Sequence, residues 1–461
     1  MNAARSDAIV FYGATGDLAY KQIFPALYAL AQHDRLDIPV IAVAKAGWEL
    51  PSLKARARDS LLAHGAIDET AFARLASVLR YVGGDYRDKA TFTALRRELG
   101  DARRPLHYLA IPPELFPIIV DHLAGSGCAE GARIVVEKPF GHDLASARAL
   151  NRTLHEVFPE ESIFRTDHYL GKEAVQNLFY FRFANSFLEP LWNRTQIASV
   201  QITMSESFGV EGRGSFYDGV GAIRDVIQNH MLQVAALLAM EPPTGEGYDE
   251  VRAAKTQVLR AARPLDPAQV VRGQYGGYRN EPGVAADSDV ETFAALRLEF
   301  DTWRWAGVPF LIRAGKKLPM TAAEVVVDFR EPPLDIFREA VAGSRNSVRF
   351  RLSPEIVIAL QARAKVPGDA MRGEQIELTV RHHPAEILPA PYERLLGDAL
   401  EGDPGLFARE DTVEAAWRIV EPVLDGAVAV HQYRPGTWGP REASRLARCG
   451  WHNPDPRGPA R

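Results

Sequence analysis

The sequence has little cysteine, no concentrated charge of either sign and no long apolar run. Only Cys128 and Cys449 occur among 461 residues, and neither lies in a pair with metal-ligand spacing. We therefore expect no disulfide framework, no bound metal and a reducing compartment. The 54 basic and 59 acidic residues give a net charge of −5 without long blocks of like charge, which argues against a nucleic-acid partner. No stretch reaches the ~18 apolar residues of a membrane span, and the apolar run near the N-terminus is too short for a signal peptide, so we expect a cytoplasmic protein with no membrane partner.

The first third of the chain alternates short apolar runs with amphipathic stretches. Strands are expected at 8–12, 38–44, 79–82, 106–111 and 133–136, and helices at 18–32, 89–99 and 114–123. Strands this apolar, each followed by a helix, predict a Rossmann-like, doubly wound parallel sheet that is buried on both faces. Ligands bind such sheets beyond the carboxyl ends of the strands.

From about residue 173 the pattern changes. Strand-like runs at 197–208, 292–300 and 324–329 have few helices between them, apart from two long helices near 221–239 and 249–262. This pattern predicts a large α+β domain with a mostly antiparallel sheet. The length also favours two large domains, which we place at 1–172 and 173–461.

A glycine-rich turn separates the first strand from the first helix. Its residues are Gly13, Ala14, Thr15, Gly16, Asp17 and Leu18. Backbone amides in such a turn face a pyrophosphate, which predicts a dinucleotide site; the alternative is a tight turn in which Asp17 only caps the helix. The next strand ends at Lys45, where dinucleotide folds read the adenosine ribose. A cation there pairs with a 2′-phosphate and favours NADP over NAD, unless Lys45 is simply a solvated lysine.

Lys138 lies in the motif EKPFG, directly after an apolar strand. A lysine at this end of a strand points into the cleft of a doubly wound sheet, so we expect it to contact both substrate and cofactor. The following Pro139 constrains the turn and could form a cis bond. The alternative is a salt-bridged lysine near a turn.

The segment RTDHYLGK, residues 165–172, lies at the junction of the two sequence patterns. His168, Tyr169 and Lys172 each offer a hydrogen bond or a charge to phosphate oxygens, which predicts a phosphorylated small molecule. Asp167 cannot help to bind a dianion, so we expect it to orient an imidazole. The alternative is a charged loop between domains.

His230 follows apolar residues at helical spacing within IRDVIQNH, which places it on the apolar face of the helix at 221–239. Most histidines in such positions are satisfied core residues. A histidine in a dry cleft is also what abstraction of a hydroxyl proton requires, and the neighbouring motifs favour that second interpretation.

Several fragments, in this order, resemble glucose-6-phosphate 1-dehydrogenases over nearly the whole chain: GATGDLAYKQIFPAL, EKPFG, RTDHYLGKE, IRDVIQNH, VRGQYGGY, WRWAGVPFLIRAGKKL and YRPGTWGP. The resemblance implies an NADP-binding domain at 1–172 and a domain for substrate binding and oligomerisation at 173–461. It also implies oxidation of glucose 6-phosphate to the 6-phospholactone, the first step of the oxidative pentose phosphate pathway, by a homodimer or homotetramer.

Carried over to matching positions, the resemblance implies that His230 is the base and Asp167 its partner. The implied substrate contacts are His168, Tyr169, Lys172, Lys138, Glu206, Asp225 and Lys316. The implied cofactor contacts beyond the glycine-rich turn are Lys45, Asp85, Tyr86, Pro112 and Lys138.

Three positions depart from the family pattern. Gln22 and Thr321 stand where relatives usually carry basic residues, and Lys45 replaces an arginine, which removes bidentate recognition of phosphate. We therefore expect NAD to be used as well as NADP. Two alternatives stay open: the same chemistry on another hexose phosphate, and an inactive regulatory relative.

Overall fold

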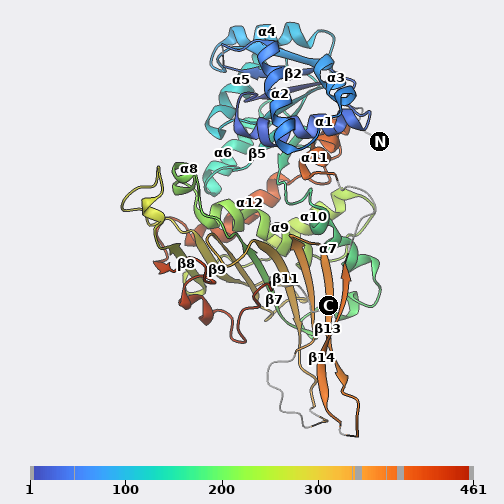
Figure 1. The fold of residues 1–461 in the computed structure, drawn as a ribbon, viewed down its shortest axis with the longest axis vertical. Helices are drawn as coiled ribbons and strands as arrows, with labels where there is room; N and C mark the ends of the chain where they lie inside the picture. Colours follow the sequence, from blue (N-terminus) through green and yellow to red (C-terminus); the bar gives the residue numbers. More distant parts are fainter. Residues whose placement is uncertain are drawn as a thin grey trace. The chain divides into compact units, whose positions relative to one another are not determined.

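The computed structural model describes residues 5–45, 47–334, 336–337, 345–369, 371–381 and 389–455 (Figure 1). The chain divides into two compact units, and each is described by itself. The first unit comprises Met1–Lys172, Thr244–Ala253 and Leu388–Glu414, and the second comprises Glu173–Pro243, Ala254–Ile387 and Ala415–Arg461. Two later segments of the chain thus belong to the first unit, although the sequence analysis assigned them to the second domain.

The first unit contains a six-stranded sheet in the order β3-β2-β1-β4-β5-β6, and every neighbouring pair is parallel. The strands are β1 Ala8–Tyr12, β2 Val40–Ala44, β3 Leu79–Gly83, β4 Pro105–Leu109, β5 Arg133–Glu137 and β6 Ile163–Thr166. The predicted Rossmann-like sheet is confirmed. Only β6, four residues long and containing the buried Arg165, has no counterpart among the predicted strands.

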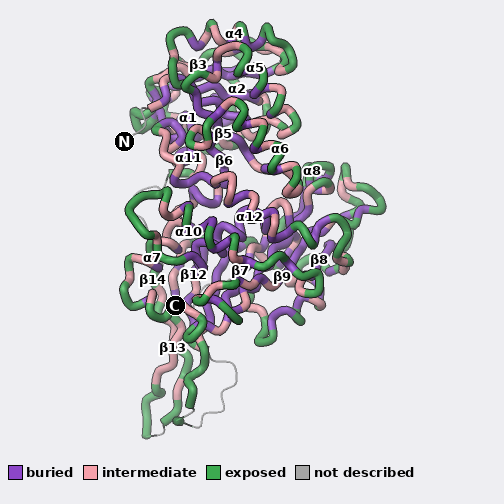
Figure 2. The backbone as a smooth tube through the Cα atoms, turned by 180° about the vertical axis from the view of Figure 1, so that it is seen from behind, coloured by how far each residue is buried: buried purple, intermediate pink, exposed green. Residues whose placement is uncertain are grey.

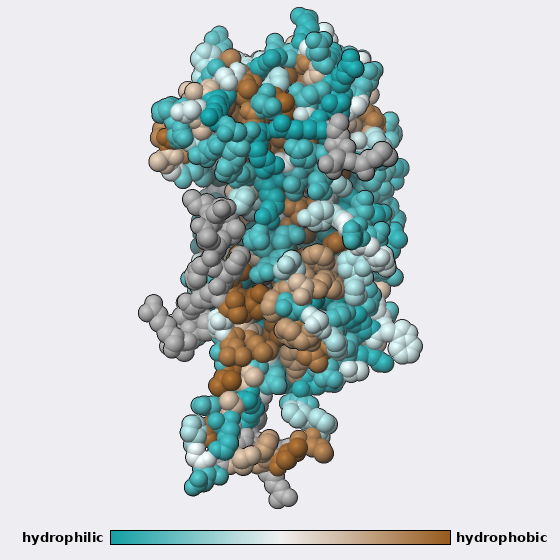
Figure 3. Space-filling model, turned by 90° about the vertical axis from the view of Figure 1, so that its right-hand side faces the viewer, coloured by the Kyte–Doolittle hydropathy of each residue, from teal (hydrophilic) through white to brown (hydrophobic). Residues whose placement is uncertain are grey.

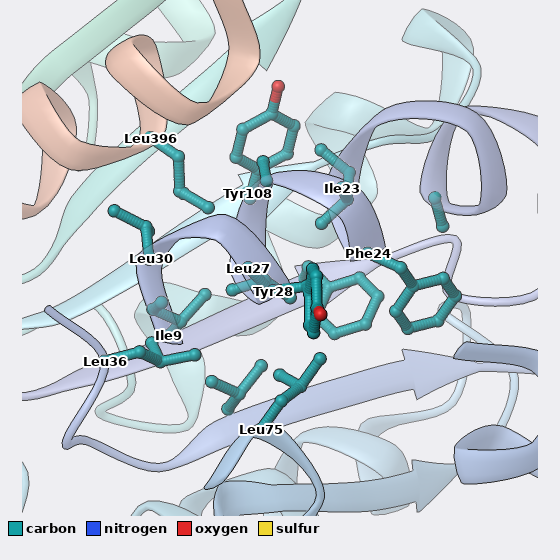
Figure 4. Close-up of a cluster of buried hydrophobic side chains, with 14 of the residues drawn as sticks. Ile9, Ile23, Phe24, Leu27, Tyr28, Leu30, Leu36, Leu75, Tyr108 and Leu396 are labelled. Carbon is teal, nitrogen blue, oxygen red and sulfur yellow. The ribbon is translucent and has the colours of Figure 1, made fainter. Parts of the chain in front are cut away.

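Helices cover both faces of this sheet (Figure 1). They are η1 Ala19–Ile23, α1 Phe24–Gln32, α2 Leu50–His64, α3 Glu69–Val78, α4 Lys89–Leu99, η2 Pro113–Leu115, α5 Phe116–Gly125, α6 Leu144–His155, η3 Glu160–Ser162 and α11 Pro391–Glu401. In the core, Leu27 and Leu30 of α1 pack with Ile9 of β1, Leu75 of α3 and Leu396 of α11 (Figure 4). The segment that includes α11 is therefore an integral part of the first hydrophobic core.

The second unit contains a nine-stranded sheet in the order β14-β13-β12-β11-β7-β10-β9-β8-β15. Its strands are β7 Ile197–Ser205, β8 Val270–Tyr275, β9 Phe293–Leu298, β10 Phe310–Gly315, β11 Ala322–Phe329, β12 Ser347–Ser353, β13 Val357–Lys365, β14 Gly373–Arg381 and β15 Val430–Tyr433. Only β7–β10 and β8–β15 pair in parallel, so the predicted, mostly antiparallel sheet is confirmed. The central strands are buried, whereas most residues of the β13–β14 ribbon are partly or fully exposed (Figure 2).

The other helices are α7 Glu173–Ala184, η4 Glu189–Leu191, α8 Gly214–Asp218, η5 Ile223–Met231, α9 Leu232–Ala239, α10 Tyr248–Arg260, η6 Pro267–Gln269, η7 Tyr278–Asn280, α12 Glu410–Val420, η8 Glu421–Val423 and η9 Arg441–Arg445. Both long helices expected here are present, but the first half of the segment at 221–239 is a π-helix, η5. Wide helical turns of this kind are frequent at functional sites. Among the described helices, none combines the length and apolar character needed to cross a membrane.

Candidate functional site

The glycine-rich turn packs closely against the carboxyl ends of β2 and β4. Gly13 has φ +82°, and a Cβ atom there would lie 2.2 Å from the carbonyl oxygen of Ala110, so only glycine fits. Its amide donates to the Tyr86 hydroxyl at 2.8 Å and to the Val43 carbonyl at 3.1 Å. No side chain caps the helix that follows, and Asp17 is exposed. The alternative in which Asp17 serves as the helix cap is therefore wrong.

The predicted cofactor residues all follow strands of the first unit. Lys45 is exposed after β2, and its carbonyl accepts a hydrogen bond from Tyr81 at 3.2 Å. Asp85 and Tyr86 follow β3, and the exposed Pro112 follows β4. These positions surround the carboxyl edge of a parallel sheet, which is where nucleotides bind in this architecture.

Glu137, at the end of β5, forms the centre of a buried hydrogen-bond network. Its carboxylate accepts hydrogen bonds from the hydroxyls of Tyr108 and Tyr392. Burial raises the pKa of Glu137 to about 7, against the opposing effects of the Tyr108 hydrogen bond and of the Lys138 charge. The peptide bond between Lys138 and Pro139 is cis, as the motif allowed. The network fixes the backbone from which the Lys138 side chain leaves the sheet.

The predicted phosphate-binding side chains lie together directly after β6. The Lys172 ammonium lies 3.8 Å from the centroid of the Tyr169 ring, and the His168 ring lies 5.5 Å from the same ring. On its other side His168 stacks on Tyr392, with 6.1 Å between centroids and 16° between planes. Asp167 is buried, and its Oδ1 accepts the Tyr169 amide at 3.0 Å. Aromatic contacts thus hold an imidazole, a phenol and an ammonium group in one cluster.

The second unit brings together three of the implied substrate contacts, Glu206, Asp225 and Lys316. Lys316 Nζ lies 2.5 Å from Glu206 Oε2 and 5.0 Å from the centroid of the Tyr217 ring. Burial raises the pKa of Tyr217, and the nearby carboxylates of Asp225 and Glu206 add to that effect. Lys316, Glu206 and Tyr217 line a small cavity in this unit. The arrangement offers alternating donors and acceptors, as a polyhydroxylated ligand requires.

His230 is 2% exposed and lies on the π-helix η5, five residues after Asp225. Asp167 belongs to the first unit and His230 to the second, so their pairing stays a prediction. Thr321, one of the departures from the family pattern, accepts a hydrogen bond from the Ser207 amide at 3.0 Å, next to Glu206. This position therefore carries a neutral hydroxyl instead of a cation.

Sequence reasoning missed several side chains that the structure places among these groups. Glu137 is the first residue of the motif EKPFG. Its position at the end of a buried strand was the only feature of the sequence that pointed to a buried carboxylate. Tyr217 and Tyr392 lie outside every motif, and only the folded chain brings them to Lys316 and to Glu137.

Family models match both parts of the chain. The model "Glucose-6-phosphate dehydrogenase, NAD binding domain" matches residues 10–177, and the model "Glucose-6-phosphate dehydrogenase, C-terminal domain" matches residues 179–452. Among curated relatives, glucose-6-phosphate 1-dehydrogenase 1 of Mycobacterium tuberculosis is 47% identical over 452 residues, which is 97% of each chain.

Solved structures agree with these matches. The crystal structure of glucose-6-phosphate 1-dehydrogenase from Mycobacterium avium superposes with a TM-score of 0.92 at 47% identity, covering 98% of this chain and 99% of that one. A glucose-6-phosphate dehydrogenase in complex with its substrate glucose-6-phosphate gives a TM-score of 0.90 at 34% identity, covering 98% of this chain and all of that one (100%). The matched models, the full-length relatives and the shared fold all agree: the chain belongs to the glucose-6-phosphate dehydrogenase family.

Proposed function

We propose that this protein oxidises D-glucose 6-phosphate to 6-phospho-D-glucono-1,5-lactone with reduction of NADP, and that it also uses NAD. The cluster of His168, Tyr169 and Lys172 beside the buried Asp167 carries the proposal, because it offers a phosphate dianion several hydrogen bonds and a charge. A relative of the same fold has been solved with glucose-6-phosphate as its substrate.

In this mechanism His230 accepts the proton of the anomeric hydroxyl. Its burial on η5 limits the access of water to the ring, so the imidazole takes the proton directly from the sugar and releases it to solvent later in the cycle. Asp167 is the proposed partner of His230 and stabilises the imidazolium that forms, because a carboxylate favours the charged form of a nearby histidine.

The other polar side chains bind and orient the sugar. Lys172 and His168 hold the phosphate, while Glu206, Asp225 and Lys316 are proposed to fix the hydroxyls. Lys316 is held by Glu206, so its ammonium keeps one orientation when the sugar enters. Lys138, on the rigid turn after β5, is proposed to contact substrate and cofactor.

The first unit fits a dinucleotide. Gly13 lets the turn pack closely against the backbone after β4, and a tight turn that opens a helix is where a pyrophosphate binds in this architecture. When bound, the nicotinamide ring supplies a hydride acceptor for C1 of the sugar. Residues 13–18 with Lys45, Asp85, Tyr86, Pro112 and Lys138 are the proposed contacts.

The second unit is the proposed oligomerisation domain of a cytoplasmic homodimer or homotetramer. Strand β14 forms one edge of its sheet and exposes Leu378 and Val380, which are 60% and 65% exposed, while Leu360 of β13 is 40% exposed. Figure 3 shows apolar side chains gathered on one face of the molecule. An apolar edge strand of this kind is commonly covered by a second chain.

Turnover of glucose 6-phosphate, followed as nicotinamide absorbance at about 340 nm, tests the proposal. The variant His230→Asn should still bind the sugar phosphate, but its kcat should be lower by a factor on the order of 10²–10⁴. Near-normal turnover in this variant would refute the role of His230. A higher kcat/KM for another hexose phosphate would instead favour the alternative substrate, and absence of turnover with every sugar would favour a regulatory relative.

A further inference from the structure

Arg56 of α2 extends its guanidinium group towards the glycine-rich turn. The guanidinium carbon lies 4.9 Å from the centroid of the Tyr20 ring and 5.7 Å from that of Trp48. Tyr20 lies in η1, directly after the turn, and Trp48 lies in the loop after β2, three residues beyond Lys45. Arg56 Nη2 also donates to the carbonyl of Gly16 at 3.4 Å. The side chain therefore bridges the turn and the loop that follows β2.

Most donors of this guanidinium group are unused. Its Nε is buried and has no hydrogen-bond partner, and the contact to Gly16 is at the long limit of a hydrogen bond. Within the described part of the chain, no carboxylate forms an ion pair with Arg56. Arg58, two residues later, is different, because both of its terminal nitrogens bind Glu69. The terminal nitrogens of Arg56 therefore carry donors that no described carboxylate uses, and a ligand with several acceptor oxygens can bind them.

The location of the Arg56 guanidinium indicates which part of a dinucleotide it would contact. Backbone amides of the turn face the pyrophosphate, whereas the end of β2 is where dinucleotide folds read the adenosine ribose. Lys45 gives that place a point charge but lacks the planar fork of an arginine. The aromatic rings of Tyr20 and Trp48 hold the Arg56 guanidinium in one orientation, so less conformational entropy is lost when it binds a phosphate.

We propose that Arg56 is a specificity-determining residue that binds the 2′-phosphate of NADP together with Lys45. Arg56, on α2, thus offers the 2′-phosphate the two parallel hydrogen bonds that Lys45, at the end of β2, cannot form. This inference rests on the proposed use of NADP, and it adds a residue on another element to the cofactor site.

The test is equilibrium binding, which requires no turnover. Isothermal titration calorimetry with 2′,5′-ADP and with 5′-AMP compares ligands that differ only in the 2′-phosphate. Arg56→Ala should weaken binding of 2′,5′-ADP by about tenfold to a hundredfold and leave 5′-AMP unchanged. Arg58→Ala, on the same helix, is the matched control and should change neither affinity.

Two outcomes would overturn the inference. Equal losses for both ligands would show that Arg56 binds the shared adenosine or 5′-phosphate, and unchanged affinities would show that it binds no part of them. Should Arg56→Ala fail to fold, Arg56→Lys keeps the charge without the fork, and it should still weaken 2′,5′-ADP selectively. If the affinities change as expected but the protein does not oxidise glucose 6-phosphate, the proposed function is wrong and the role of Arg56 in binding the 2′-phosphate still holds.

Discussion

The ionisation of Glu137 should make the stability of this protein depend on pH. The pKa of this carboxyl rises from 4.5 to about 7 on folding, chiefly because the group is buried. Between these two values the folded protein retains a proton that the unfolded chain has lost. The free energy of unfolding should therefore fall by about 1.4 kcal/mol for each pH unit in that window, as the pH rises. Over the whole window the free energy of unfolding falls by about 3 kcal/mol, and the loss is complete above about pH 7.

Glu137→Gln isolates this contribution, because glutamine keeps the shape and an acceptor for the tyrosine hydroxyls but cannot ionise. Urea-induced unfolding of both proteins between about pH 4 and pH 8 gives the difference in their free energies of unfolding. The difference should move by about 3 kcal/mol in favour of the variant as the pH rises. Glu114→Gln, which changes an exposed carboxylate, serves as the control.

A difference between the parent and Glu137→Gln that stays constant over this range would refute the argument, because it would mean that Glu137 ionises alike in both states. Tyr392→Phe provides a second check. The hydrogen bond from Tyr392 lowers the pKa of Glu137 in the folded protein, so its loss should raise the upper limit of the pH-dependent window, while the lower limit, set by the unfolded chain, stays the same.

Substitutions at four further positions test other contacts. Lys172→Ala should raise the KM for glucose 6-phosphate far more than that for free glucose, since its charge pairs only with the phosphate; equal changes would place the phosphate elsewhere. Gly13→Ala should lower the free energy of unfolding by about 2 kcal/mol or more and weaken nucleotide binding, and an unchanged thermal midpoint would contradict the tight approach at this turn. Glu206→Gln should destabilise the protein by about 2 kcal/mol in urea unfolding, because it leaves the Lys316 ammonium buried without its carboxylate. Lys45→Ala should narrow the preference for NADP over NAD, chiefly through the KM for NADP, while Lys45→Arg should widen it.

The sequence by itself determined five of the six strands of the first unit and the polar residues that follow them. Short apolar runs that alternate with amphipathic stretches favour buried parallel strands, and β1 has the predicted ends. Because the ends of these strands share one edge, the motifs after them were predicted to form one site. The chemistry expected at that site also came from the motifs. The residues at 168–172 suit a phosphate, and His230 suits the abstraction of a hydroxyl proton.

Only the tertiary structure decided which distant segments complete the units. Strand β6 contains Arg165, and a charged residue in so short a run does not suggest a buried strand. In the folded unit Glu160 pairs with the Arg165 guanidinium and Asn151 accepts a hydrogen bond from it, so the residue can be buried. The segment Leu388–Glu414 joins the first unit and brings Tyr392 to Glu137.

The direction of the Arg56 side chain and the π-helical form of η5 were likewise decided by packing. Hydrophobic periodicity records which face of an element is buried, but it does not record which other element covers that face. Contacts between residues far apart in the chain depend on the packing of the whole unit, so they emerge only when it has folded.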